Sequence, residues 1–497
     1  MVKRHGLSPV NRVSLTFIGI AGFCLLFADV SISTSDPWGE LLRLIQGIFS
    51  PHLQAVENIG LALVYTLSFA LIGVTVGVWF GFVMAMFFHF RFIRIFCAVI
   101  RAVHELFWAL IFLQLFGLSP LTGLLAIGIP YAGIFAKVFA EILEEADSRP
   151  LRVVPPGTSA VSAFLFVRLP DAWRHFRSYT LYRLECGLRS SAVLGFVGLP
   201  TLGYYMETSF SQGDYSGVAA LLMLFYVLIA TLRLWMRRAL LPLYLLIAIF
   251  VMPWGMGVIN LSNIGRFLTS DIIPYPLRTD GLTVEGLGGF ADWVWTLLAG
   301  QAFPGAIATV QLTMIALVVT GLVTVLAFPL ISPLFFRRPG RLSGHLLLVV
   351  VRSTPEYLIA FVLLQLWGPS MLPAIVALAL HNGAIIGHLT GRFTEELKLR
   401  RDHPRGRVNL YFYEVLPRVY RQMLAFLFYR WEIIMRETAI LGMLGIATLG
   451  FYIDSAFAEI RIDRALFLIL LTALLNICVD NISRYVRSRL RLQTRLN

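Results

Sequence analysis

The sequence predicts an all-α, polytopic membrane protein with about twelve transmembrane helices, arranged as two parallel repeats of six. Of its 497 residues, 58% are hydrophobic and 14% are charged, whereas a soluble chain has about 25% charged residues. The hydrophobic residues lie in stretches of about 20, the length that an α-helix needs to cross a bilayer. One long segment also recurs in both halves of the chain. Because backbone groups in lipid must hydrogen-bond within the protein, long apolar runs favour a helix bundle.

The apolar stretches predict six spans in each half of the chain. Those of the first half lie at about 14–30, 58–88, 95–117, 119–143, 178–207 and 216–235. Those of the second half lie at about 239–258, 305–335, 343–367, 371–393, 424–453 and 464–483. With a cytoplasmic N-terminus, the basic loop residues fall on the cytoplasmic side, as the positive-inside rule requires. Both termini are therefore predicted to be cytoplasmic, and 259–303 to be the longest external segment.

An internal repeat supports the division into two halves, residues 1–238 and 239–497. Residues 182–205 and 429–452 are identical at twelve of twenty-four aligned positions. Internal repeats of this kind are typical of transporters, and six spans per copy return the chain to the same side of the membrane, so the copies run in parallel.

Each half has a long segment between its fourth and fifth spans, predicted to be cytoplasmic, at 144–177 and 394–423. The first contains Gly157, nine residues, Val167, one residue, and then Leu169 and Pro170. The second keeps Leu416 and Pro417, but Pro404 occupies the glycine position. Because proline fixes φ and removes a donor, we expect a helix in the second segment to begin or bend differently.

This spacing resembles the cytoplasmic-loop signature of the permeases of binding-protein-dependent ABC importers. The resemblance implies that Gly157, Val167, Leu169, Pro170, Leu416 and Pro417 belong to two coupling helices, each docking on an ATPase subunit. A rigid helix tied to two spans can transmit closure of the ATPase to the bundle. Both copies lack the Glu-Ala-Ala that opens the family motif, and an ordinary basic loop with an incidental Leu-Pro pair is the alternative interpretation.

Residues 178–203 are similar to the fifth helix of phosphonate ABC transporter permeases, and residues 425–450 resemble it again. That family has a glycine-rich run after this helix. At the same place this chain departs from the family, with Leu-Pro-Thr-Leu at 199–202 and Ile-Ala-Thr-Leu at 446–449. The resemblance implies an ABC importer type I fold in the bacterial inner membrane, with one fused chain replacing a half-size homodimer. It also implies transport of a small anionic solute, phosphonate or a related oxyanion, from periplasm to cytoplasm by alternating access. The implied partners are two ABC ATPase subunits and a periplasmic solute-binding protein.

Ionisable residues within apolar spans are costly and mark functional candidates. The candidates for the translocation pathway are Glu185, Arg189, Glu432, Arg436, Arg101, Glu105, Arg352, Glu356, Lys137, His381 and His388. Glu185 and Arg189 have the i,i+4 spacing that favours pairing on one helix face, and Glu432 and Arg436 repeat it. Lining of the pathway and fixation of helices both remain open for these pairs.

The sequence argues against a nucleotide site or catalytic chemistry in this chain. A P-loop needs a Gly-Lys-Ser/Thr sequence, and the lysines, Lys3, Lys137 and Lys398, follow other residues. We therefore expect no bound cofactor, with ATP hydrolysed by a partner subunit. The cysteines show no metal-binding spacing, and the basic residues lie in short loops beside lipid rather than in a nucleic-acid-binding surface. The alternative function is a twelve-helix secondary transporter driven by ions, and the solute itself is not specified.

Overall fold

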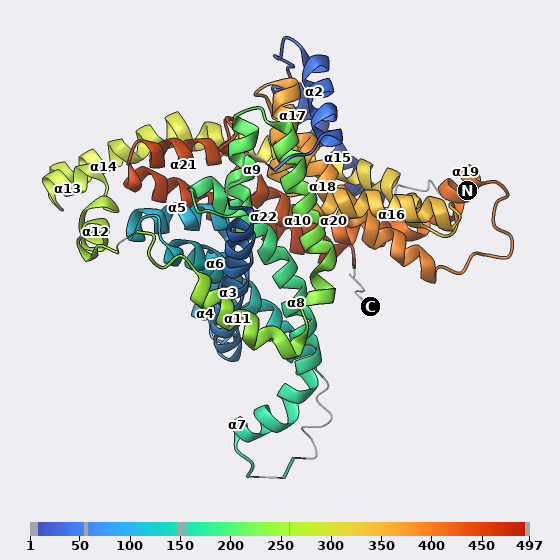
Figure 1. Ribbon diagram of the computed structural model, residues 1–497, viewed down its shortest axis with the longest axis horizontal. Coiled ribbons are helices and arrows are strands. Elements are labelled where there is room, and N and C mark those ends of the chain that lie inside the picture. The colour runs from blue at the N-terminus through green and yellow to red at the C-terminus, as the bar shows by residue number, and fades with distance from the viewer. Residues whose placement is uncertain (1–7, 54–57, 147–153, 156, 258, 493–497) are drawn as a thin grey trace, which may run out of the picture. The chain divides into compact units, whose positions relative to one another are not determined.

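The computed structural model describes residues 8–53, 58–146, 154–155, 157–257 and 259–492 (Figure 1). All regular secondary structure in these residues is helical, which confirms the predicted all-α class. The chain divides into two compact units, Met1–Leu42 with Ile273–Asn497, and Arg43–Ile272. We call the first the outer-segment unit, because it consists of the two ends of the sequence, and the second the central unit, because it consists of the middle of the sequence.

Seven helices of the described chain are long and apolar enough to cross a membrane, or nine if two bent pairs each count as one span. They are Pro9–Leu26, Ile59–Met86, Pro120–Glu145, Tyr215–Leu232, Val284–Ile331, Met371–Glu396 and Ile462–Arg489, with the bent pairs Arg91–Ala102 plus Glu105–Phe116 and Arg338–Ser353 plus Glu356–Trp367. The chain is therefore a multi-pass membrane protein, and the count of twelve spans stays a prediction.

The central unit is a helix bundle around α3 and α6. Its helices are α3 (Ile59–Met86), α4 (Arg91–Ala102), α5 (Glu105–Phe116), α6 (Pro120–Glu145), α7 (Ala160–Ala163), α8 (Leu169–Val193), α9 (Leu202–Ser211), α10 (Tyr215–Trp235), α11 (Leu241–Val251) and α12 (Leu261–Arg266), and α2 (Pro37–Phe49) contains the boundary between the units. Gly73, Gly77 and Gly81 form a stripe on α3, where a Cβ would press against Ile127, Tyr131 and Phe135 of α6. Small residues at this spacing let two helices approach closely in lipid.

The outer-segment unit is built around α15, α18 and α20. Its helices are α1 (Pro9–Leu26), α13 (Tyr275–Asp280), α14 (Val284–Leu297), α15 (Phe303–Ala327), α16 (Arg338–Ser353), α17 (Glu356–Trp367), α18 (Met371–Phe393), α19 (Arg407–Leu410), α20 (Leu416–Gly442), α21 (Leu449–Ala458) and α22 (Ile462–Arg489). Here the glycine stripe lies on α18 instead, at Gly383, Gly387 and Gly391, against α15 and the helical turn after it.

The first predicted span of each half packs with the remaining helices of the other half. In the outer-segment unit, α1 lies on α15, and Phe17 makes edge contacts with Phe428 and Trp431 of α20. In the central unit, α11 lies along α3 (Figure 1). The compact units therefore differ in membership from the repeats 1–238 and 239–497, whose boundary stays a prediction from the sequence duplication.

The third predicted span of each half is not one helix, which corrects the sequence prediction. In place of a span at 95–117, α4 and α5 meet at 92°, and in place of a span at 343–367, α16 and α17 meet at 90°. His104 caps α5 by accepting from the amide of Leu106 at 3.1 Å, and the indole of Trp108 donates to the carbonyl of Ile100 at 3.2 Å. These contacts stabilise the bend, because they satisfy backbone groups that a helix end leaves unpaired.

The fifth predicted spans, 178–207 and 424–453, are also broken. After α8, Gly198 adopts φ of 89°, and after α20, Gly445 adopts φ of 86°. Residues other than glycine rarely adopt this left-handed conformation. These two glycines therefore form turns, and the short helices α9 and α21 follow them.

Candidate transport core and coupling segments

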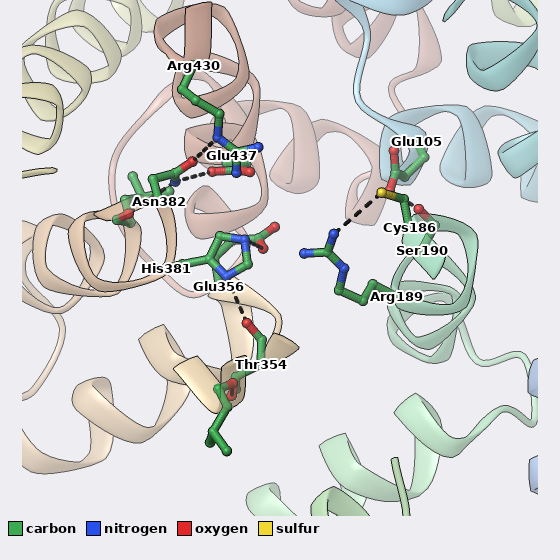
Figure 2. Close-up of polar contacts among 12 residues, drawn as sticks. Glu105, Cys186, Arg189, Ser190, Thr354, Glu356, His381, Asn382, Arg430 and Glu437 are labelled. Atoms are coloured by element: carbon green, nitrogen blue, oxygen red, sulfur yellow. Dashed lines mark hydrogen bonds and ion pairs between the residues drawn. The ribbon is translucent and has the colours of Figure 1, made fainter. Parts of the chain in front are cut away.

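The outer-segment unit contains a buried polar network on α17, α18 and α20. Asn382 lies at its centre and donates to Glu437 Oε2 at 2.8 Å, while its own Oδ1 accepts from Arg430 Nε at 2.8 Å (Figure 2). Asn382 and Glu437 are buried. The amide therefore separates a guanidinium from a carboxylate and hydrogen-bonds with both.

Glu356 and His381 extend this network toward the bend between α16 and α17. His381 Nδ1 lies 2.9 Å from the carbonyl of Thr354, which can only accept, so the ring carries its proton on Nδ1. Nε2 then lies 3.8 Å from Glu356 Oε2. Glu356 is the first residue of α17, where the helix dipole favours a negative charge.

Glu356, His381 and Glu437 place ligand atoms within 4.8 Å of one another. Two carboxylates and an imidazole are a donor set that a divalent transition metal accepts. Glu437 and His381, however, already have hydrogen-bond partners in Asn382 and Thr354. The expectation that the chain has no metal site stays a prediction. In the part of the chain that the structure describes, Glu356, His381 and Glu437 are the group that could hold a metal ion.

The central unit carries a corresponding network built from different side chains. Ser190 Oγ donates to Glu105 Oε1 at 2.6 Å and lies 3.1 Å from the hydroxyl of Tyr131. Glu105 is the first residue of α5, as Glu356 is of α17. Arg183 lies over the ring of Tyr131 at 5.8 Å and donates from Nε to the hydroxyl of Tyr179 at 2.8 Å.

The two networks occupy equivalent positions of the repeat. Aligning the repeated segments matches Arg183 with Arg430 and Ser190 with Glu437, and aligning Glu105 with Glu356 also matches Tyr131 with Asn382. Among the residues that the structure describes, neither Arg183 nor Arg430 has a carboxylate partner. In each unit the arginine at this position of the repeat therefore contacts only neutral groups.

Sequence reasoning missed these two arginines, together with Asn382, Glu437 and Ser190. Arg183 and Arg430 are identical in both copies of the repeat, which was the available signal. Their importance follows from contacts between α6 and α8 and between α18 and α20, which helical periodicity does not specify.

The i,i+4 pairs expected on the fifth helices do not form in the described structure. Glu185 and Arg189 are half-buried, but Arg189 directs Nη2 to Cys186 Sγ at 3.5 Å (Figure 2), and no ion pair joins it to Glu185. Glu432 and Arg436 are also half-buried and form no ion pair with each other. Whether these four residues line the pathway stays a prediction.

The remaining candidates lie at the helix bends and on the fourth helices. Arg101 and Arg352 are in the last turns of α4 and α16, so each is separated by a bend from Glu105 or Glu356. On α6, Lys137 lies 3.9 Å from Glu141. His388, the equivalent residue on α18, is buried and lies 3.3 Å from His345 between ring nitrogens.

The two predicted coupling segments have the same local structure, which corrects the expectation that they differ. In the first, α7 and a π-helical segment at 164–168 lead directly into α8. In the second, α19 and a π-helical segment at 411–415 lead into α20, so every boundary falls at the equivalent position. The reason is a second glycine, because Gly157 has φ of 94° before α7 and Gly406, two residues after the proline position, has φ of 90° before α19.

Matching apolar side chains are exposed on these segments. Val161 is 67% exposed and Phe166 79%, and the equivalent residues Val408 and Tyr413 are 68% and 75% exposed. Leu165 and Phe412 lie at another equivalent exposed pair. Contiguous exposed apolar residues mark interaction surfaces. Val167 lies in the first π-helical segment, and Leu169 with Pro170, like Leu416 with Pro417, opens the long helix that follows.

Comparison with known proteins identifies one relative that aligns with nearly the whole chain and others that align with about a quarter of it. The phosphate-import permease protein PhnE of Mycolicibacterium smegmatis is 25% identical over 493 residues, which cover 92% of this chain and 90% of that protein. The phosphite transport system permease protein PtxC of Stutzerimonas stutzeri is 31% identical over 137 residues, which cover 27% of this chain and 50% of that protein. A relative in Escherichia coli, named for a cryptic phosphonate transport system, is 27% identical over 116 residues, which cover 23% of this chain and 95% of that protein.

No family model matches the chain, and no solved structure matches it. The named relatives are permeases and not enzymes, which agrees with the absence of a P-loop in the sequence. Together with the membrane helices and the repeated fifth-helix motif, these matches show that the chain is similar to a phosphate-import permease along nearly its whole length, and to phosphite and phosphonate transport permeases over shorter segments.

Proposed function

We propose that this chain is the permease subunit of an ATP-binding-cassette importer that moves a small phosphorus oxyanion from the periplasm to the cytoplasm. The observation that carries the proposal is the alignment with a phosphate-import permease along 92% of the chain. The inner membrane, the cytoplasmic termini and a periplasmic solute-binding protein are parts of the same proposal. The distribution of basic residues in the loops supports the cytoplasmic termini.

The coupling segments support a partner that supplies the energy. Their equivalent exposed surfaces, around Phe166 and Tyr413, are apolar and lie on rigid helices that continue into α8 and α20. Two such surfaces in one chain fit two ATPase subunits. Movement of either short helix would be transmitted directly to the helix that carries Arg183 or Arg430, since no flexible linker separates them.

Arg183 and Arg430 are the residues that we assign to oxyanion contact. A guanidinium offers a planar set of donors that matches two oxygens of a phosphate-like group. An arginine that is paired with a carboxylate must give up that carboxylate before it can bind another anion. Arg183 is instead held by aromatic rings and Arg430 by an amide. Binding an anion there does not require breaking an ion pair with either residue.

Uptake of radiolabelled phosphate, phosphite and a phosphonate into right-side-out membrane vesicles tests the proposal. We expect uptake of at least one of them to require ATP inside the vesicle and the solute-binding protein outside. Uptake that persists without ATP and collapses with the ion gradient would establish the ion-coupled alternative. The control is the Arg183→Gln, Arg430→Gln double variant, which we expect to insert normally but not to transport.

A further inference from the structure

A basic cavity lies in the outer-segment unit and is lined by residues other than those of the polar network around Asn382. It has a volume of about 560 Å³ and lies between the first turns of α16 and the end of α18. Its polar lining consists of Arg338, Arg341, His345, His388, Arg392 and Glu395. Three guanidinium groups therefore face one carboxylate.

The lining residues are brought together by helical spacing. Arg338, Arg341 and His345 follow one another at three and four residues on α16, which places them on one face. His388 and Arg392 are four residues apart on α18, and Glu395 follows in the next turn. Two helix faces with the same character thus meet at this cavity.

Only one of the three arginines is engaged by a carboxylate. Arg341 lies 3.1 Å from Glu395 and also donates to the carbonyl of Ile331 at 3.2 Å. The guanidinium groups of Arg338 and Arg392 have no acceptor among the residues that the structure describes, and both side chains are exposed. The cavity therefore has two positive charges free to bind an anion.

The other half of the chain does not repeat this arrangement. Aligned as above, the position of Arg392 is taken by Glu141, which pairs with Lys137, and the position of Arg341 is taken by Phe90. Since the polar networks are present in both units but this cavity is basic in one only, it has a role separate from the duplicated core.

We propose that this cavity binds a phosphate group, and that the phosphate belongs to the headgroup of an anionic phospholipid. Arginine forks match phosphate oxygens in pairs, and the uncapped first turn of α16, where Arg338 is the first residue, adds a favourable dipole. A stripe of exposed apolar residues, Leu342, Leu346 and Val350, continues along α16 from the cavity. This stripe provides contact for acyl chains beside the headgroup, and basic pockets between transmembrane helices are typical sites for such headgroups.

Native mass spectrometry of the full-length chain in detergent, titrated with phosphatidylglycerol or phosphatidylcholine, tests the proposal. We expect phosphatidylglycerol to bind preferentially to the natural protein. The Arg338→Gln, Arg392→Gln double variant should bind it at least about tenfold more weakly, since it lacks two guanidinium groups that form charge-assisted contacts with phosphate. The control, Arg401→Gln with Arg405→Gln, removes the same charge from exposed residues outside the cavity and should bind like the natural protein.

Thermal unfolding with inorganic phosphate, against chloride at equal ionic strength, separates the two sources of a phosphate group. Stabilisation by phosphate that the cavity variant loses would keep the phosphate site but assign it to a free oxyanion. Equal phosphatidylglycerol binding by the natural protein and the cavity variant, without a phosphate-specific shift, would overturn the proposal. The single variant Arg392→Gln provides the same comparison if the double variant does not fold.

Discussion

The polar networks of the two units show how far one scaffold can diverge while keeping one feature. Both place a glutamate at the start of a bent helix and an arginine on the long helix after the coupling segment. In the outer-segment unit an amide joins Arg430 to the buried Glu437, whereas in the central unit tyrosine rings hold Arg183, and Ser190 replaces the second carboxylate. The arginine is retained and its surroundings are not. Because the guanidinium is the group that both networks keep, this difference supports the proposal that it contacts the oxyanion in both units.

The largest effect is expected at the helical corner that both units share. A Cβ on Gly203 would overlap the carbonyl oxygen of Ala192, and one on Gly450 would overlap that of Ala439. Because backbone must move to relieve such an overlap, Gly203→Ala and Gly450→Ala should each abolish the folded protein. Fluorescence-detected size-exclusion chromatography measures this, with Gly22→Ala as the control, because a Cβ there meets nothing within 4 Å. Normal elution of both corner variants would show that the packing is looser than described.

The next largest effect is expected on transport, from the arginines. Arg183→Gln and Arg430→Gln should each lower the initial rate of oxyanion uptake by about 10- to 100-fold, the loss of one or two charge-assisted contacts. Elution of both variants should be unchanged. If only one of the two variants reduces uptake, the two arginines do not have equivalent roles in transport.

Two other residues of the polar networks, Glu437 and Ser190, should differ in their effect on stability. Glu437→Gln keeps an acceptor for Asn382 and removes a buried charge, so the free energy of unfolding should change by less than about 1 kcal/mol. Ser190→Ala removes the donor to Glu105 and should destabilise by about 1.5–3 kcal/mol. Thermal denaturation in detergent compares the two variants. A larger loss of stability in Glu437→Gln than in Ser190→Ala would contradict this prediction.

A smaller effect is expected from the half-buried residues that the sequence emphasised. Because Glu185 and Arg189 form no ion pair, the Glu185→Gln, Arg189→Gln double variant should be expressed and eluted normally. We expect uptake to fall by no more than about tenfold, less than about 1.4 kcal/mol. Full transport in this variant would exclude the pair from the pathway, and loss of the folded protein would instead establish a structural role.

The smallest effect concerns pH and the second coupling segment. The pKa of Glu414 lies below its ordinary value. Burial alone would raise this pKa. Hydrogen bonds from Arg418, at 2.6 Å, and from the Arg400 amide, together with the charges of both arginines, outweigh that effect. A carboxyl group with a lowered folded-state pKa stabilises above its unfolded pKa, about 4.3, and loses this contribution as the pH falls through the folded value. Hydrogen-exchange protection factors of residues 407–418, which correct for the intrinsic pH dependence of exchange, should fall in that acidic range. Glu414→Gln should remove the pH dependence, and an unchanged profile would contradict the contact.

Much of this architecture was accessible from the sequence, because hydropathy and an internal repeat depend on composition and order alone. The all-α membrane class and the likeness to phosphonate permeases are confirmed. The bends before Glu105 and Glu356 were not predicted, although charged residues interrupt both apolar runs there and Pro355 stands directly before Glu356. The apolar segments on either side were joined into one span because their combined length suits a membrane crossing. The polar networks were missed because their members come from separate helices. The expected Glu185–Arg189 pair does not form, which shows that an i,i+4 spacing allows an ion pair but does not ensure it.

We propose that two diverged copies of one core, fused in one chain, replace the two subunits of a half-size permease. Native mass measurement of the assembly purified with its ATPase determines how many copies of this chain one transporter contains. We predict one copy of this chain with two ATPase subunits, one at each coupling segment. An assembly containing two copies of this chain would contradict the account.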